Sequence, residues 1–208
     1  KMELEIQRIN SYTDERFHEN VLKQHGAFLV NQVLPYEVEI TGKDSAVVRG
    51  EKEEYFEAVI EEFRFFAEHI TKFYDKNNRL LKQYDEVPVF TVELAQIQPS
   101  QFYVDKEKKE AVASFVQSEE DVIVPVIPYG ERYISFDGHT RMAVAADKGI
   151  TKIKAFFGED AEYIHDFVAE AVRRGVTTPY DLPELPHGEY EVKWNQFCDA
   201  YFAEDEEE

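Results

Sequence analysis

The chain has a single cysteine, Cys198, among its 208 residues. One thiol excludes an intramolecular disulfide and a zinc site built from cysteines, and we expect Cys198 to pack rather than react. No run of residues approaches the roughly 18 uncharged apolar positions of a membrane helix. The first residues also lack the apolar core of a signal peptide. We therefore predict a cytoplasmic protein with no membrane partner.

Basic residues are scarce, since 23 Lys and Arg stand against 43 Asp and Glu, which gives a net charge of -20. Proteins that hold nucleic acids neutralise phosphates with clustered Lys and Arg. The charge balance therefore argues against a nucleic-acid partner, although a local basic pocket could still take a small, metal-bound nucleotide. Hydrophobic residues make up 43% of the chain and aromatics 14%, which excludes a disordered chain.

Several motifs are also missing. The sequence has no Walker-type glycine loop, dinucleotide fingerprint or serine-centred elbow. Its histidines at 18, 25, 165 and 187 lack the i, i+4 spacing of a helical metal site. Ligation of a metal by histidines is therefore not expected.

Residues 1–84 predict an N-terminal unit with a short helix over 14–24, a β-meander and a long helix. Three β-like runs, separated by turn residues at 34–35 and 42–44, make up the antiparallel meander: 27–31, 36–41 and 46–49. Aromatic and aliphatic residues then recur at three- and four-residue steps over 51–75, which is typical of an amphipathic helix. We expect this stripe to enter the core; a homodimer interface is the less favoured alternative.

Residues 85–175 predict a second domain, in which strands and helices alternate. The expected strands lie at 89–94, 122–127, 132–136 and 152–157, and the expected helices at 105–117, at 139–148 and after Asp160. Asp105 and Asp160 are suitable N-caps, and Pro125 implies an edge or bulge position for its strand. The elements 132–136, 139–148 and 152–157 predict a right-handed strand–helix–strand unit.

Residues 176–208 predict a C-terminal extension. Its aromatic residues, from Trp194 to Phe202, suggest a short helix that docks back, and the acidic tail 204–208 is expected to be solvated. Together the segments predict an α/β (α+β) protein with a mixed sheet.

The most informative residues are Asp137-Gly138-His139-Thr140-Arg141. They join an expected strand to the N-terminus of an expected helix, where backbone N–H groups converge on an anion. Arg141 can fork two hydrogen bonds onto a phosphate, while Thr140 offers a hydroxyl. Asp137 can cap the helix, bind Mg²⁺ or accept a proton. The pattern predicts a site for a phosphorylated ligand.

The segment from about 87 to 157 resembles the ParB/sulfiredoxin-like superfamily. The matching pieces keep one order along the chain: Ile97–Gln101, a helix, Val124–Val126, Tyr133–Arg141 and Ala143–Gly149. Members of this superfamily bind nucleotides with the loop found here at 137–141. The branch whose loop reads Asp-Gly-His-x-Arg is similar to the free serine kinases, which phosphorylate a small amino acid. Sulfiredoxins carry a catalytic cysteine in this loop, where this chain has His139.

The resemblance implies a nucleotide-binding phosphotransferase that uses ATP or ADP with Mg²⁺ on a small molecule. Asp137 and His139 are the candidate catalytic residues, and Ser100 and Gln101 are expected to face the same cleft as the loop. In the kinases, a glutamate that serves as the catalytic base stands where this chain has Gln101. A glutamine side chain cannot accept a proton in this way. Another carboxylate, such as Asp137, would then act as the base, or the chain binds nucleotide without this reaction. The alternatives are therefore a non-catalytic nucleotide-responsive regulatory module and, less favoured by the charge, a DNA-processing ParB-like nuclease.

Overall fold

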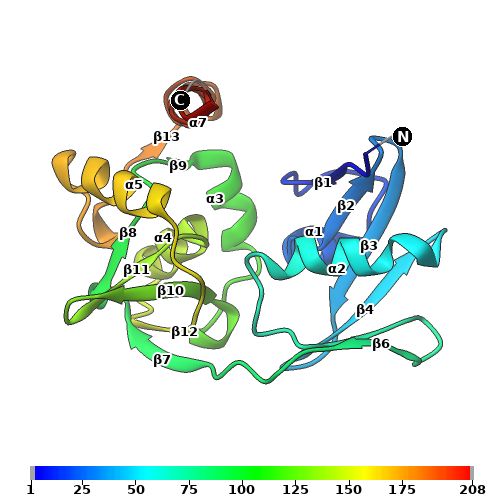
Figure 1. Ribbon diagram of the computed structural model, residues 1–208. Helices are drawn as coiled ribbons and strands as arrows, with labels where there is room; N and C mark the ends of the chain where they lie inside the picture. Colours follow the sequence, from blue (N-terminus) through cyan, green and yellow to red (C-terminus); the bar gives the residue numbers. More distant parts are fainter. Residues whose placement is uncertain (1–2, 207–208) are drawn as a thin grey trace. The chain divides into compact units, whose positions relative to one another are not determined.

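The computed structural model describes residues 3–206 (Figure 1). Helices and sheets with both parallel and antiparallel pairs confirm the α/β class. The chain forms two compact units, the first ending at Val89 and the second beginning at Phe90. The segment from residue 176 onward, predicted as an extension, belongs to the second unit.

Six strands form the sheet of the first unit, in the order of the sequence. They are β1 (Ile6–Arg8), β2 (Ala27–Val30), β3 (Leu34–Ile40), β4 (Ser45–Gly50), β5 (Lys72–Tyr74) and β6 (Leu80–Gln83). Neighbours are antiparallel except β4 and β5, which are parallel. The predicted meander corresponds to β2, β3 and β4. The turn predicted at Leu34–Pro35 is wrong, because Pro35 pairs within β3 and the turn uses the positive φ angles of Asn31 and Gln32.

The two helices of the first unit are both shorter than predicted. α1 spans only Glu19–Lys23, and the helix expected over 51–75 is a 3-10 turn, η1 (Glu53–Tyr55), followed by α2 (Phe56–Arg64). α2 stops because Arg64 folds back and donates to the carbonyls of Glu68 (2.9 Å) and Ile70 (3.1 Å), which stabilises a turn into β5.

The apolar face of α2 enters the core of the first unit. Its residues Phe56, Val59, Ile60 and Phe63 are buried together with aromatic and aliphatic side chains of β2, β3 and β4. The core role predicted for the aromatic stripe is therefore confirmed, and Ile70 and Phe73, beyond the end of α2, are buried in the same core. Lys72–Tyr74 form β5 instead of a helix, since pairing with β4 overrides the local helical pattern.

The second unit contains a five-stranded sheet of order β7-β12-β10-β11-β8. Its strands are β7 (Phe90–Glu93), β8 (Ile97–Pro99), β10 (Ile123–Tyr129), β11 (Arg132–Ser135) and β12 (Lys152–Phe157). The helices are α3 (Lys106–Ala113), α4 (His139–Asp147) and α5 (Glu162–Arg173). Short 3-10 turns lie at η2 (Leu94–Gln96), η3 (Glu119–Asp121) and η4 (Pro179–Asp181).

The connection from β11 through α4 to β12 is not the parallel unit predicted from the sequence. β10 lies between β11 and β12, antiparallel to the first and parallel to the second. β11 and β12 therefore run in opposite directions, and the handedness rule for parallel crossovers does not apply. The segment around Ile97, for which no strand was predicted, forms the strand β8 and pairs with β11.

Pro125 was predicted to take an edge or bulge position, but β10 is not an edge strand. β10 has neighbours on both sides, but its pairing with β11 begins only at Val126, opposite Ser135. The carbonyls of Val122 and Val126 accept hydrogen bonds from the β12 side, so the backbone groups of Pro125 point toward β11. Because proline has no N–H, the ladder ends there and β11 stops at Ser135.

The two predicted N-caps have different outcomes. The Asp105 carboxylate accepts from the amide of Glu107 and caps α3, as predicted. α5, in contrast, begins after Ala161, and Asp160 bonds His165 at 2.8 Å, so the predicted Asp160 cap is wrong. α3 also ends four residues before the predicted Gln117.

The C-terminal segment is helical and docks on the second unit, as predicted. It contains α6 (His187–Tyr190), a π-helical stretch, η5 (Glu191–Asn195), and α7 (Gln196–Glu206). The rings of Trp194 and Phe197 pack 4.9 and 5.0 Å from the ring of buried Phe102. Burial raises the pKa of Cys198 to about 11, so this thiol stays protonated and packs. The acidic tail predicted at 204–208 is helical through Glu206, and its last two residues lie outside the described residues.

His187 attaches this segment to the rest of the second unit. Its Nδ1 lies 2.6 Å from the buried Asp105 carboxylate, which belongs to a short two-stranded sheet of β9 (Val104–Asp105) and β13 (Glu184–Leu185). Its Nε2 lies 2.8 Å from Glu191. The hydrogen bond with Asp105, and the charges of Asp105, Glu191 and Glu107, raise the pKa of His187 above its ordinary value.

We expect His187→Gln to destabilise the protein more at pH 5.5 than at pH 8.5. Because the pKa of His187 is raised in the folded state, protonated His187 stabilises the fold. This contribution is fully present below the unfolded-state pKa of 6.5, and it is lost as the pH rises through the folded-state pKa. Thermal melts of both proteins at the two pH values measure the difference. Equal losses at both pH values would contradict the charged pair.

Candidate functional site

The loop between β11 and α4 is built around Gly138, which has φ = 80° and serves as the N-cap of α4. A Cβ atom at this position would lie 2.5 Å from Val124 Cγ1 and 2.9 Å from Arg141 Nη2. Both the left-handed backbone and the close packing on β10 therefore require glycine. The glycine predicted from the sequence as a turn residue has a strict steric role.

The first turn of α4 leaves backbone amides outside the helical ladder. The first i, i+4 bond of α4 runs from the amide of Met142 to the carbonyl of Gly138, at 2.9 Å. The amides of His139, Thr140 and Arg141 precede it, as at every helix N-terminus. Since glycine has no side chain, the N-cap does not cover them. Amides so placed favour a negative charge.

His139 is buried, with 4% of its surface exposed, and it joins the loop to the end of β8. Its Nε2 accepts a hydrogen bond from the amide of Ser100 at 3.1 Å. Burial lowers the pKa of His139 to about 4, against the smaller opposing effects of Asp137 and the Ser135 backbone. The ring is therefore neutral at pH 7 and acts as an acceptor in this arrangement.

Ser100 and Ser135 complete this connection. Ser100 Oγ donates to the carbonyl of Ser135 at 2.8 Å, and Ser135 Oγ donates to the carbonyl of Asp137 at 2.7 Å. The structure thus brings Ser100 and His139 together, as predicted, through a chain of hydrogen bonds. Ser135 was not singled out in the sequence, because a serine in a strand carries no distinguishing local signal.

Arg141 occupies the space that opens where β11 ends. Its Nη1 donates to the carbonyl of Ile123 at 3.0 Å, and its Nη2 lies 3.4 Å from Asp137 Oδ2. Ile123 is two residues before Pro125, so its carbonyl also points toward the missing part of β11. The Arg141 guanidinium therefore bonds a carbonyl that a residue of a longer β11 would otherwise bond. Of its five N–H donors, these contacts use two.

Gln101 points toward the C-terminal segment. Its Nε2 donates to the carbonyl of Tyr103 at 2.6 Å and to the hydroxyl of Tyr190 at 3.3 Å. Gln101 shares the turn of Ser100 but makes these contacts away from the loop 137–141. Tyr163 of α5 lies close enough to Asp137 that the carboxylate adds to the effect of burial in raising the Tyr163 pKa.

The residues available for a metal ion are few at this site. Within residues 3–206, no group of three or more His, Cys, Asp or Glu side chains is arranged to hold a metal ion. Mg²⁺ in nucleotide sites commonly uses one or two carboxylates together with phosphate oxygens and water. Asp137, partly exposed, is the carboxylate of the loop that could act in this way.

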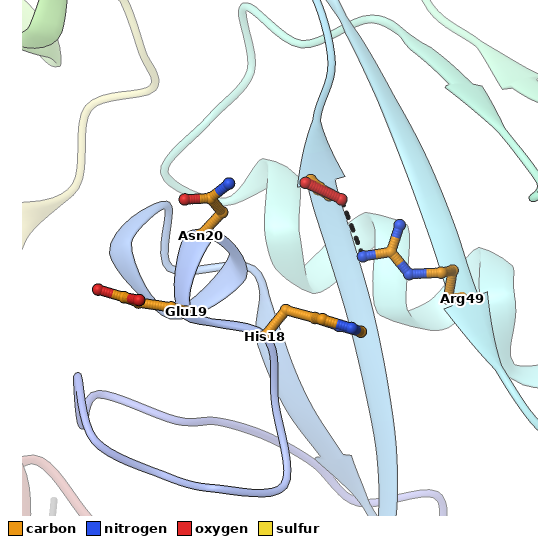
Figure 2. A pocket seen from close by; sticks show the side chains of 5 residues that line it. His18, Glu19, Asn20 and Arg49 are labelled. Carbon is orange, nitrogen blue, oxygen red and sulfur yellow. Dashed lines mark hydrogen bonds and ion pairs between the residues drawn. The ribbon is translucent and has the colours of Figure 1, made fainter.

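A charged pocket of about 500 Å³ lies in the first unit. Figure 2 shows His18 and Asn20 of the α1 region on one side and Arg49 on the other, with the ion pair between Arg49 and Glu39. Beside them, the buried Glu37 carboxylate accepts from His18 Nδ1 (2.8 Å) and Arg49 Nε (3.3 Å). Burial raises the pKa of Glu37, but the hydrogen bonds from His18 outweigh it and leave the pKa lowered. These contacts tie α1 to β3 and β4.

Comparison with known proteins identifies no family for the chain: no family model matches, and a search of curated proteins finds no match. The structure is similar to the crystal structure of protein Atu1540 from Agrobacterium tumefaciens, with 16% sequence identity and a TM-score of 0.31. That match covers 47% of this chain and 53% of the other, so the chain spans about half the length of that protein. Within the described part of the chain, no helix has both the length and the apolar composition to span a bilayer.

We expect His139→Leu to cost about 1–3 kcal/mol of folding free energy at pH 7, because the buried Ser100 amide loses its acceptor. Urea denaturation measures this loss. Thr140→Ala, which alters the adjacent and less buried side chain, is the control and should stay within about 0.5 kcal/mol.

The stability of the wild-type protein and that of His139→Leu should also depend differently on pH in the acid range. A folded-state pKa of about 4, below the ordinary 6.5, gives stability that is present above pH 6.5 and is lost as the pH falls toward 4. His139→Leu should lack this part of the pH dependence. An unchanged acid slope would show that the ring is not buried in the neutral form.

Proposed function

We propose that the protein binds a nucleotide through its phosphates at the loop 137–141, as the resemblance to the ParB/sulfiredoxin-like superfamily implies. One observation carries the proposal: Gly138 caps α4 without a side chain, so the first amides of the helix remain available to an anion. The hydrogen bonds through His139 and Ser135 hold these amides in place, and a fixed array of donors binds anions without reorganisation.

Arg141 and Asp137 supply the remaining charges of the proposed site. The Arg141 guanidinium keeps donors beyond those bonded to Ile123 and Asp137. Binding of Mg²⁺ with ATP or ADP would place Asp137 on the metal and leave Arg141 to the phosphate. The contact between the two side chains is long, at 3.4 Å.

A phosphotransferase acting on a small molecule such as an amino acid is the enzymatic form of this proposal. Phosphoryl transfer depends mostly on positioning and charge neutralisation, which the loop is suited to supply. In this form Asp137 would accept the proton instead of holding Mg²⁺, because Gln101 has no ionisable group and neutral His139 already accepts from Ser100. The net charge of -20 disfavours DNA processing.

A nucleotide-responsive regulatory module is the second candidate, and one contact favours it. Gln101, at the kinase glutamate position, bonds Tyr190 of α6 at 3.3 Å. This position therefore connects the turn beside the loop to the C-terminal helical segment. A nucleotide that shifts the turn would also change how that segment is held.

We expect MgATP or MgADP to stabilise the protein, by about 2.7 kcal/mol at a hundredfold excess over Kd. Thr140→Asp should abolish the effect, because its carboxylate occupies and repels the phosphate position while still suiting a helix N-terminus. Thr140→Asn, of the same shape but uncharged, is the matched control and should retain most of the shift. Thermal shift and calorimetry measure both. Equal nucleotide affinity in the Asp and Asn variants would place the binding site elsewhere.

Phosphorus NMR with MgATP or MgADP and a mixture of amino acids separates the two candidate functions. A phosphotransferase should give a new phosphoester signal that Asp137→Asn reduces at least a hundredfold, the usual effect of losing a general base. Binding without any transferred phosphoryl group favours the regulatory module. Transfer that persists in Asp137→Asn would exclude Asp137 as the base.

A further inference from the structure

Three aromatic rings from three strands of the second unit lie together on its sheet: Phe90 of β7, Tyr133 of β11 and Phe157 of β12. The Phe157 ring centroid is 4.9 Å from that of Phe90 and 6.0 Å from that of Tyr133, and the Phe90–Tyr133 distance is 5.7 Å. Their planes are inclined by only 35–47°. We call these three residues the aromatic floor.

The aromatic floor differs from the aromatic packing in the core of the same unit. Around buried Phe102, the rings of Trp194 and Phe197 meet it edge to face, at 83°. Phe157 is 50% exposed, and Phe90 and Tyr133 are half-buried. Each ring of the aromatic floor therefore keeps some surface that a ligand can reach.

The strand register places the aromatic floor on the face of the sheet that carries the loop. Phe157 is opposite Val126, and Phe90 is opposite Ala155, which in turn is opposite Val124. Tyr133 lies two residues before Ser135, the other partner of Val126. Paired residues and residues two apart share a face, so all three rings project from the side of Val124.

Gly138 sits on that same face, because a Cβ added to it would touch the Val124 side chain. Neighbouring strands are about 5 Å apart and alternate residues about 7 Å apart. These spacings put the Cα atoms of Phe157 and Phe90 within roughly 8–11 Å of that of Val124, against which Gly138 packs. A ribose with one phosphate spans a gap of this size.

α4 leaves this part of the face open. From Gly138 the chain runs to Thr151, whose carbonyl accepts from the amide of Leu94, just beyond the C-terminal end of β7. The aromatic floor includes Phe90, at the opposite end of β7. The N-terminus of α4 therefore points toward the half of the sheet that carries the rings.

We propose that the aromatic floor (Phe90, Tyr133 and Phe157) is the platform on which the base of the bound nucleotide stacks, with its phosphates at the first amides of α4. This inference rests on the proposed nucleotide function and adds the recognition of the base. Stacking on aromatic rings is tolerant of base identity, because every base has a π-face. A neutral base also needs no cationic partner, which suits a chain with net charge -20.

The test compares ADP with pyrophosphate, each with Mg²⁺, by titration calorimetry on the full chain. ADP should bind at least tenfold more tightly than pyrophosphate, since stacking on an aromatic side chain contributes about this factor or more. Phe157→Ala should remove most of the advantage of ADP while leaving pyrophosphate affinity unchanged. Phe202→Ala, which removes another half-exposed ring in the same unit, is the control and should change neither affinity.

NMR of the adenine protons gives an independent readout. Stacking on the platform should move the H2 and H8 signals upfield in the wild-type protein and not in Phe157→Ala. Equal affinities for ADP and pyrophosphate would overturn the platform while leaving phosphate binding at the loop intact. Failure of both ligands to bind would overturn the proposed function and the platform together. An ADP advantage that survives in Phe157→Ala, with no upfield shift, would overturn the platform alone.

Discussion

The absence of an amide hydrogen at Pro125 determines where the candidate site forms. Without that donor the ladder between β10 and β11 cannot continue past Val126 and Ser135. The chain therefore leaves the sheet there, turns at Gly138 and starts α4 over β10. The carbonyl of Ile123, which the shortened strand leaves without a partner, is satisfied by Arg141. One missing donor thus accounts for the end of the strand, the position of the loop and the conformation of the arginine.

The polar side chains of the loop 137–141 make structural contacts within the protein. His139 and Ser135 hold the loop to the end of β8 and to its own backbone, and Arg141 completes the sheet. Sites that bind anions through backbone amides depend on such support, because the amides themselves cannot be adjusted. These contacts explain why His139 and Arg141, which mark the loop in the sequence, bond groups within the protein.

Much of the second unit could be predicted from the sequence, and the reasons differ between elements. β12 and α4 were predicted within one residue, because their apolar pattern, the turn residues and Gly149 agree. The central position of β10 was missed, since its proline suggests an edge and only the full strand order shows how it is tolerated. The helix over 51–75 was overpredicted because aromatic residues of β5 continue the helical spacing of α2. The partners of His139 and Gln101 come from distant segments, which no local pattern reveals.

Asp105 shows how two parts of the second unit depend on one side chain. One of its oxygens closes the N-terminus of α3 through the Glu107 amide, and the other holds His187 at the start of α6. Removal of the carboxylate would therefore remove two contacts at once, the cap of α3 and the hydrogen bond of His187. The C-terminal segment would keep its ring contacts with Phe102 and Phe167. One carboxylate thus couples the start of α3 to the position of α6.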